Sequence, residues 1–339
     1  MVLSSGHRVA CRVGPGVIAI MPHGKWHFWL MGIIIIGLIM LVRHVADFTH
    51  FLTLAKQAEP LWLAVALLLQ LGTYVSLASG WRMILRRAGE DASFLFLMRI
   101  ALLKLFIDQT LPTAGMSGNI LLVNQLIKTN ISRGVAVAVL LLSMIGYYAA
   151  YIAFALLALW LLWRQDDATL FMAGIIACFM MVAIFIPAMA LWLHHRGRRP
   201  LPKWLGHFGL VAALLRTIGL APANLLRDRN ALAQVTLCNA LIFSLDAATL
   251  FACLHGLGQD VGFATALIGL IMASVAVTLA PLPFGLGSFE VACTATLHVL
   301  GVSIEAALAA TMLLRALTLW LPLVPGLILF RRGGAYSPR

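Results

Sequence analysis

Long apolar stretches alternate with short polar ones along most of this chain. A membrane-spanning helix needs about 20 mostly apolar residues, and six stretches approach or exceed that length: Trp26–Val42, Leu61–Ser79, Val135–Trp163, Ala168–Leu193, Ala231–Leu254 and Ala306–Phe330. Polar and basic residues lie between them. The pattern predicts an all-α polytopic membrane protein with six spanning helices.

A shorter, broken stretch lies between the second and third of these. Phe94–Ile107 would form a helix of about 21 Å, too short for a hydrocarbon core of about 30 Å. A segment rich in Pro and Gly, Asp108–Asn119, follows, and then a short apolar run, Ile120–Ile127. We expect a re-entrant helical hairpin over about residues 92–130, entering from the cytoplasmic side.

A similar pattern occurs near the C-terminus, over about residues 262–303. The apolar run Gly262–Ala280 is followed by the break Pro281–Glu290 and by the short run Val291–Leu300. The charge pattern makes this hairpin enter from the outside. Two broken hairpins entering from opposite faces are typical of an inverted-repeat transporter.

Composition and charge agree with a membrane protein. The chain is 62% hydrophobic and 11% charged, with a mean hydropathy of +0.98, whereas soluble domains carry about 25% charged residues. Twenty lysines and arginines fall on one predicted side and three on the other, so the positive-inside rule places both termini in the cytoplasm. The basic residues are dispersed between apolar stretches, which argues against nucleic acid as a partner. The tails are residues 1–25 and 331–339, and residues 26–330 form one transmembrane domain.

The two breaks contain the candidate substrate-binding residues. Irregular backbone at membrane depth is tolerated where it lines a cavity or is buried in protein, and the helix after each break begins with free N–H groups that favour an anion. We therefore expect an anionic lipid headgroup to bind there. The candidates are Pro112, Gly115, Ser117, Asn119, Pro283, Gly285, Gly287, Ser288, Glu290, Arg99, Lys104 and Arg315.

Ionisable residues within apolar segments are costly and usually pair or function. Asp246, Glu290 and Asp108 are candidates for coupling transport to protons. The alternative is static pairing that holds the bundle together, Glu290 with Arg315 for example, or Lys104 with Asp108 at i,i+4 spacing. Tyr147, Tyr148 and Tyr151 in the third span either line a lipid path or only pack.

No cofactor is predicted. The five cysteines lack the close spacing of a metal or redox site, and neither HExxH nor GxSxG occurs. The sequence thus favours a protein that is not an enzyme.

Four motifs resemble the transmembrane family named for lysylphosphatidylglycerol synthase. They are Leu111–Gly115, Ser132–Val135, Pro281–Glu290 and Arg315. The resemblance implies lipid translocation without headgroup synthesis, because no aminoacyl-transferase segment follows the last span. Many members have Glu directly after the first loop's Gly and a basic residue three positions later, where this chain has Met116 and Asn119. An acid–base role for that loop is therefore not expected.

These features predict a lipid flippase of a bacterial-type inner membrane, moving a phospholipid, glycolipid or polyprenyl-phosphate type lipid by alternating access. Two alternatives are a non-transporting membrane partner of a lipid-synthesis enzyme and an intramembrane lipid-modifying transferase. The sequence does not specify the lipid, the direction, the energy source, the oligomeric state or whether translation starts at Met1 or Met21.

Overall fold

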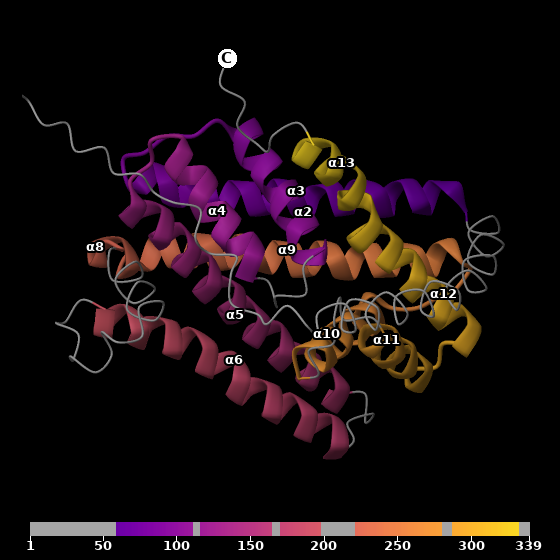
Figure 1. The fold of residues 1–339 in the computed structure, drawn as a ribbon. Coiled ribbons are helices and arrows are strands. Elements are labelled where there is room, and N and C mark those ends of the chain that lie inside the picture. The colour runs from indigo at the N-terminus through magenta and orange to yellow at the C-terminus, as the bar shows by residue number, and fades with distance from the viewer. Residues whose placement is uncertain (1–58, 111–115, 165–169, 198–220, 280–286, 332–339) are drawn as a thin grey trace, which may run out of the picture. The chain divides into compact units, whose positions relative to one another are not determined.

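The computed structural model describes residues 59–110, 116–164, 170–197, 221–279 and 287–331, and within these ranges every regular element is helical. The first half contains α2 (Pro60–Arg87), α3 (Phe94–Thr110), α4 (Met116–Lys128), α5 (Arg133–Arg164) and α6 (Leu170–Gly197). The second half contains α8 (Ala223–Leu226), α9 (Arg229–Gly256), α10 (Phe263–Leu279), α11 (Ser288–Val299), α12 (Ile304–Arg315), the π-helical turn η3 (Ala316–Trp320) and α13 (Leu321–Arg331). Figure 1 shows their arrangement.

Five helical segments are long and apolar enough to cross a membrane: Pro60–Arg87, Arg133–Arg164, Gly174–Leu193, Arg229–Gly256 and Ile304–Arg331, the last comprising α12, η3 and α13. Each overlaps one of the predicted spans. The sixth predicted span, Trp26–Val42, lies outside the described residues.

The helix limits correct the predicted breaks. Asp108 to Thr110 continue α3, and α4 begins at Met116 instead of Ile120. α11 begins at Ser288, two residues before the predicted break ends. The predicted limits were wrong because polar residues and glycines were assigned to the loops. In the structure these residues are helical, and the carboxylates of Asp108 and Glu290 accept hydrogen bonds from N–H groups at the helix starts.

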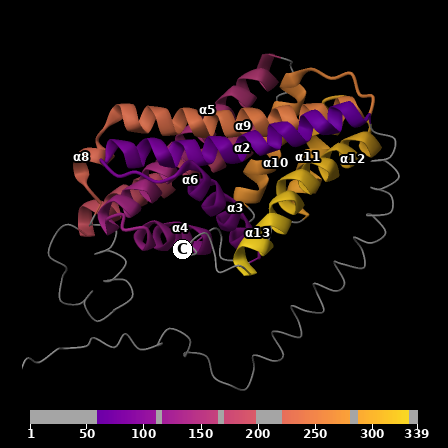
Figure 2. The same cartoon turned by 90° about the horizontal axis from the view of Figure 1, so that it is seen from above.

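α2 and α9 lie side by side and run antiparallel (Figures 1 and 2). At one end Glu59 N donates to Gly256 O at 2.9 Å. Near the other end Arg87 pairs with Asp228 at 2.6 Å. Between them Ser76 Oγ donates to the carbonyl oxygen of Cys238 at 2.8 Å.

α5 packs against α9 on another side of the same helix. A Cβ at Gly146 would lie 2.9 Å from Val235 Cγ1 and 3.2 Å from Thr236 N. Small residues allow such close approach between helices in lipid, where packing rather than the hydrophobic effect drives association. Gly146 therefore fixes how closely α5 approaches α9.

The helices α2, α3 and α4 agree in order and length with α9, α10 and α11. α2 and α9 both have 28 residues, α3 and α10 both have 17, and α4 and α11 have 13 and 12. The second residue after α2 and after α9 is a left-handed glycine, with φ 76° at Gly89 and 73° at Gly258.

The turns after α4 and α11 also correspond. The second residue beyond each helix is left-handed, Asn130 with φ 64° and Gly301 with φ 93°. A serine then precedes the next helix and caps it: Val135 N donates to Ser132 Oγ at 3.4 Å, and Ala306 N donates to Ser303 Oγ at 3.4 Å.

Candidate functional site

The second break brings a carboxylate to the start of α11. Gly287 adopts φ 86°, a conformation that favours glycine, directly before this helix. Its N–H donates to Glu290 Oε2 at 2.7 Å. A carboxylate in the first turn is also stabilised by the positive end of the helix dipole.

Arg315 binds the other oxygen of this carboxylate. It is the last residue of α12, and its Nε donates to Glu290 Oε1 at 2.8 Å. The guanidinium also lies 4.7 Å from the centre of the Phe289 ring, in range of a cation–π interaction. The Arg315 and Glu290 side chains are only 12% and 8% exposed, so this charge pair is largely desolvated.

The first break contains a comparable arrangement. Asp108, near the end of α3, accepts the N–H of Gly118 in the first turn of α4, with Oδ1 at 2.8 Å from the nitrogen. Its Oδ2 accepts from Lys104 Nζ at 2.6 Å. The Gly118 Cα faces this carboxylate so closely that an added Cβ would lie 2.5 Å from Asp108 Cγ. Only glycine fits there.

Each break thus combines a carboxylate, a glycine N–H at or next to a helix start, and one basic side chain. The chain position of the carboxylate differs: Asp108 precedes its break, whereas Glu290 follows its own. Both carboxylates occupy the position in which the sequence placed an anionic headgroup. Lys104 and Arg315 are therefore each already bound by a carboxylate of the protein.

The π-helical turn connects the two breaks. It begins directly after Arg315, and π-helical turns are frequent at functional sites. The Thr318 carbonyl oxygen in this turn accepts from Gln109 Nε2 at 3.2 Å, and Gln109 is the neighbour of Asp108. Helices α3 and α13 also pack against each other, and the ring centres of Phe106 and Phe330 lie 5.9 Å apart.

Other predicted site residues are placed differently. Ser117, Asn119 and Ser288 are half-buried within the first turns of α4 and α11. Arg99 is exposed on α3 and does not take part in the Lys104–Asp108 pair. Four predicted residues lie outside the described part of the chain: Pro112, Gly115, Pro283 and Gly285.

Asp246 lies elsewhere, in the middle of α9. It lies close enough to Gln70 and Tyr74 of α2, and to Tyr147 of α5, to interact with them. Sequence reasoning missed Gln70, although an amide inside the apolar run Leu67–Leu71 is itself a signal. Such a group must find partners within the protein.

The tyrosines of α5 form part of an aromatic cluster. Tyr151 is 1% exposed, and its ring centre lies 4.3 Å from that of Phe179 and 5.1 Å from that of Phe243. Its hydroxyl lies 3.3 Å from Thr278 Oγ1 on α10. These contacts favour packing for Tyr151, while Tyr147 at the edge of the cluster is 40% exposed.

Comparison with known proteins identifies the family. Residues 28–326 match the family model described as the lysylphosphatidylglycerol synthase TM region. A search of curated proteins found no significant match. The matched range includes both breaks and confirms the resemblance inferred from the motifs. The chain therefore belongs to the lysylphosphatidylglycerol synthase TM region family, a membrane family related to lipid handling.

Proposed function

We propose that this protein moves a lipid with a polar or anionic headgroup between the two leaflets of a bacterial-type inner membrane. The observation that carries the proposal is the pair of helix breaks, each with a carboxylate bound to a glycine N–H and to a basic side chain. Charges at membrane depth are costly and commonly mark substrate pathways.

The second element of the proposal is an inverted repeat. Helices α2–α4 and α9–α11 share their lengths and the conformations of the turns that follow α2, α4, α9 and α11, and α2 packs antiparallel to α9. Two such halves related by an axis in the membrane plane would place the two hairpins on opposite faces. Rocking of one half against the other would then expose a central site to each leaflet in turn.

In this mechanism the headgroup enters between the hairpins while the acyl chains remain in lipid. A phosphate forms strong charge-assisted hydrogen bonds with a guanidinium, so it competes with Glu290 for Arg315. Glu290 keeps its bond to the Gly287 N–H and can take Arg315 back when the lipid leaves. The bond between Gln109 and the Thr318 carbonyl ties this exchange to the first break.

The direct test uses purified protein in liposomes that contain fluorescent phosphatidylglycerol or fluorescent phosphatidylethanolamine. A membrane-impermeant quencher should remove the inner-leaflet signal much faster than in protein-free liposomes. An Arg315→Gln variant should lose most of this acceleration, whereas a variant of exposed Arg99, Arg99→Gln, should keep more of it. Equal rates with and without protein for both lipids would overturn the proposal.

The same liposomes distinguish the two alternatives. An intramembrane transferase would change the mass of extracted lipids, and a non-transporting partner would change neither lipid mass nor leaflet distribution. The flippase proposal requires redistribution between leaflets without any change in lipid mass.

A further inference from the structure

A group of buried polar atoms without partners lies between α2 and α9. Within the described residues, no hydrogen-bond partner is found for Asp246 Oδ1, Gln70 Oε1 or the Tyr74 hydroxyl. Gln70 and Tyr74 are each only 4% exposed. One N–H of the Gln70 amide donates within its own helix, to Thr73 Oγ1 at 3.3 Å.

Two of these atoms, Asp246 Oδ1 and Gln70 Oε1, are oxygens that can only accept while Asp246 is ionised. The free oxygens of Asp246 and Gln70 cannot bond to each other unless a hydrogen lies between them. Buried polar groups normally have such partners. One proton on Asp246 would supply a donor to these two oxygens.

Within the described residues, Asp246 forms no ion pair with a basic side chain. Across the described ranges, the ion pairs are Arg87–Asp228, Lys104–Asp108 and Arg315–Glu290, and none includes Asp246. A buried charge without a partner is strongly disfavoured and is commonly removed by protonation. A proton also needs no cavity, unlike a metal ion or a headgroup.

In the described part of the chain, the titratable groups that interact with Asp246 are tyrosines. Tyr74 faces it from α2, and Tyr147 faces it from α5. α10, which also packs on α9, carries no titratable residue. On α12 the charged residues are Glu305 in the first turn and Arg315, which is bound to Glu290.

The other half of the fold shows that packing does not require an acid at this position. Asp246 is the eighteenth residue of α9, and the eighteenth residue of α2 is Leu77. The eleventh residues are the amides Asn239 and Gln70. Asn239 donates to its own helix at Val235 O, at 2.8 Å.

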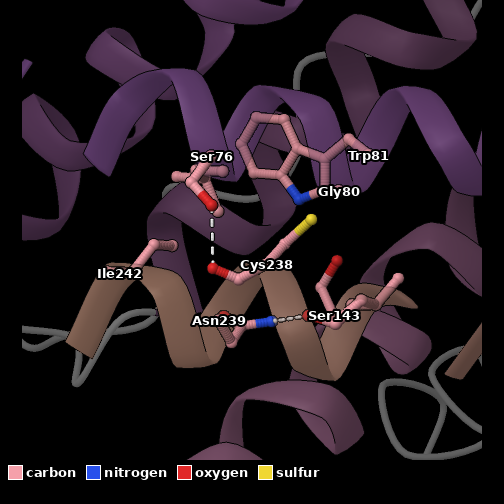
Figure 3. A pocket seen from close by; sticks show the side chains of 9 residues that line it. Ser76, Gly80, Trp81, Ser143, Cys238, Asn239 and Ile242 are labelled. Carbon is pink, nitrogen blue, oxygen red and sulfur yellow. Dashed lines mark hydrogen bonds between the residues drawn. The ribbon is translucent and has the colours of Figure 1, made fainter. Parts of the chain in front are cut away.

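A small cavity of about 10 Å³ lies next to Leu77 and Asn239, the residues that correspond to Asp246 and Gln70. Figure 3 shows Trp81 and Cys238 reaching into this space between α2 and α9. Its lining includes Leu77 and Asn239 and no carboxylate. The acid is thus specific to one half.

We propose that Asp246 is a proton-binding carboxyl whose proton is exchanged with water as the two halves of the transporter move. Binding forms an O–H bond to a proton taken from water on one face, and release returns that proton to water on the other face. This inference rests on the proposed function and names its energy coupling.

Infrared difference spectroscopy of the reconstituted protein tests the proton site without any lipid assay. A pH step should produce a carboxylic-acid C=O band that shifts in D₂O. Asp246→Asn should abolish this band. Asp260→Asn, which removes an exposed loop carboxyl, should leave it unchanged. A band that survives Asp246→Asn would overturn the inference.

A second arm measures coupling with fluorescent phosphatidylglycerol in liposomes that carry a pH difference. The wild-type rate should change severalfold when the gradient is reversed, and Asp246→Asn and Asp246→Leu should respond to neither direction. The leucine variant copies the packing at Leu77 and guards against misfolding of the asparagine variant. A variant that keeps the full gradient response contradicts the proposal. If the wild type moves no probe lipid, the proposed function fails, and the infrared titration still decides whether Asp246 binds a proton.

Discussion

Glu290 accepts a hydrogen bond from Arg315 Nε at 2.8 Å with one carboxylate oxygen and one from Gly287 N at 2.7 Å with the other. A single side chain thereby caps α11 and neutralises the cation at the end of α12. The start of α11 and the position of Arg315 therefore depend on each other.

This dependence predicts a strong coupling energy between the two side chains. Glu290→Gln keeps an oxygen that can accept from Gly287 N but leaves Arg315 uncompensated, so we expect about 3–5 kcal/mol of destabilisation. Adding Arg315→Gln should cost less than its effect in the wild-type background, with a coupling of about 1–3 kcal/mol. Thermal unfolding in detergent of the four proteins of the cycle measures this value. Strictly additive effects would mean that the pair does not hold the break together.

Gly118→Ala should disrupt the first break. The added Cβ would lie 2.5 Å from Asp108 Cγ, so the carboxylate must move away from the Gly118 N–H and from Lys104. Overpacking of this kind typically costs about 1–3 kcal/mol. The matched control is Gly174→Ala on α6, where nothing lies within 4 Å and alanine should stabilise the helix by about 0.5–1 kcal/mol. Opposite signs of the two shifts in unfolding temperature are expected, and a neutral Gly118→Ala would contradict the geometry at this break.

The sequence predicted the spanning helices well because the thickness of the bilayer sets the number of apolar residues that a spanning helix needs. Pro60–Arg87 and Arg229–Gly256 overlap the runs Leu61–Ser79 and Ala231–Leu254, but both extend beyond them. They do so because Arg86, Arg87 and Asn230 remain helical outside the apolar run, in the first or last turn.

The site was harder to predict, because its contacts join residues that are distant in the chain. The i,i+4 spacing suggested the Lys104–Asp108 pair, whereas nothing local indicated that Asp108 also caps α4 through Gly118. The neighbours of Asp246 are on α2 and α5, and only the packing of three helices brings them together.

The stability that the Arg87–Asp228 ion pair between α2 and α9 contributes should depend on pH. Hydrogen bonds, first from the Ala231 N–H and then from Arg87, lower the pKa of the partly exposed Asp228 carboxyl below its ordinary value. A carboxyl with a lower pKa in the folded state contributes stability above its unfolded pKa, and this contribution is lost as the pH falls through the folded pKa. Asn also caps helices, so Asp228→Asn removes mainly the charge.

We therefore expect wild type to melt at a higher temperature than Asp228→Asn at neutral pH and the two to converge in acid. Melting curves of both proteins from pH 7 to about pH 3, where carboxyls with ordinary pKa values are largely protonated, give the comparison. A difference that stays constant over this range would show that the charge of Asp228 contributes nothing to the fold.

The central claim is that the two breaks face water within the membrane and are reached from opposite sides. Single-cysteine variants Ser117→Cys and Ser288→Cys, in a background with the five native cysteines replaced, can be exposed to an impermeant maleimide in inside-out and right-side-out vesicles. Asp91→Cys and Asp260→Cys, at exposed positions in the loops after α2 and α9, provide the reference for each face. The account predicts that both break positions react, and that their reaction is faster from opposite faces. Labelling of both from the same face, or of neither while the loop cysteines react, would contradict it.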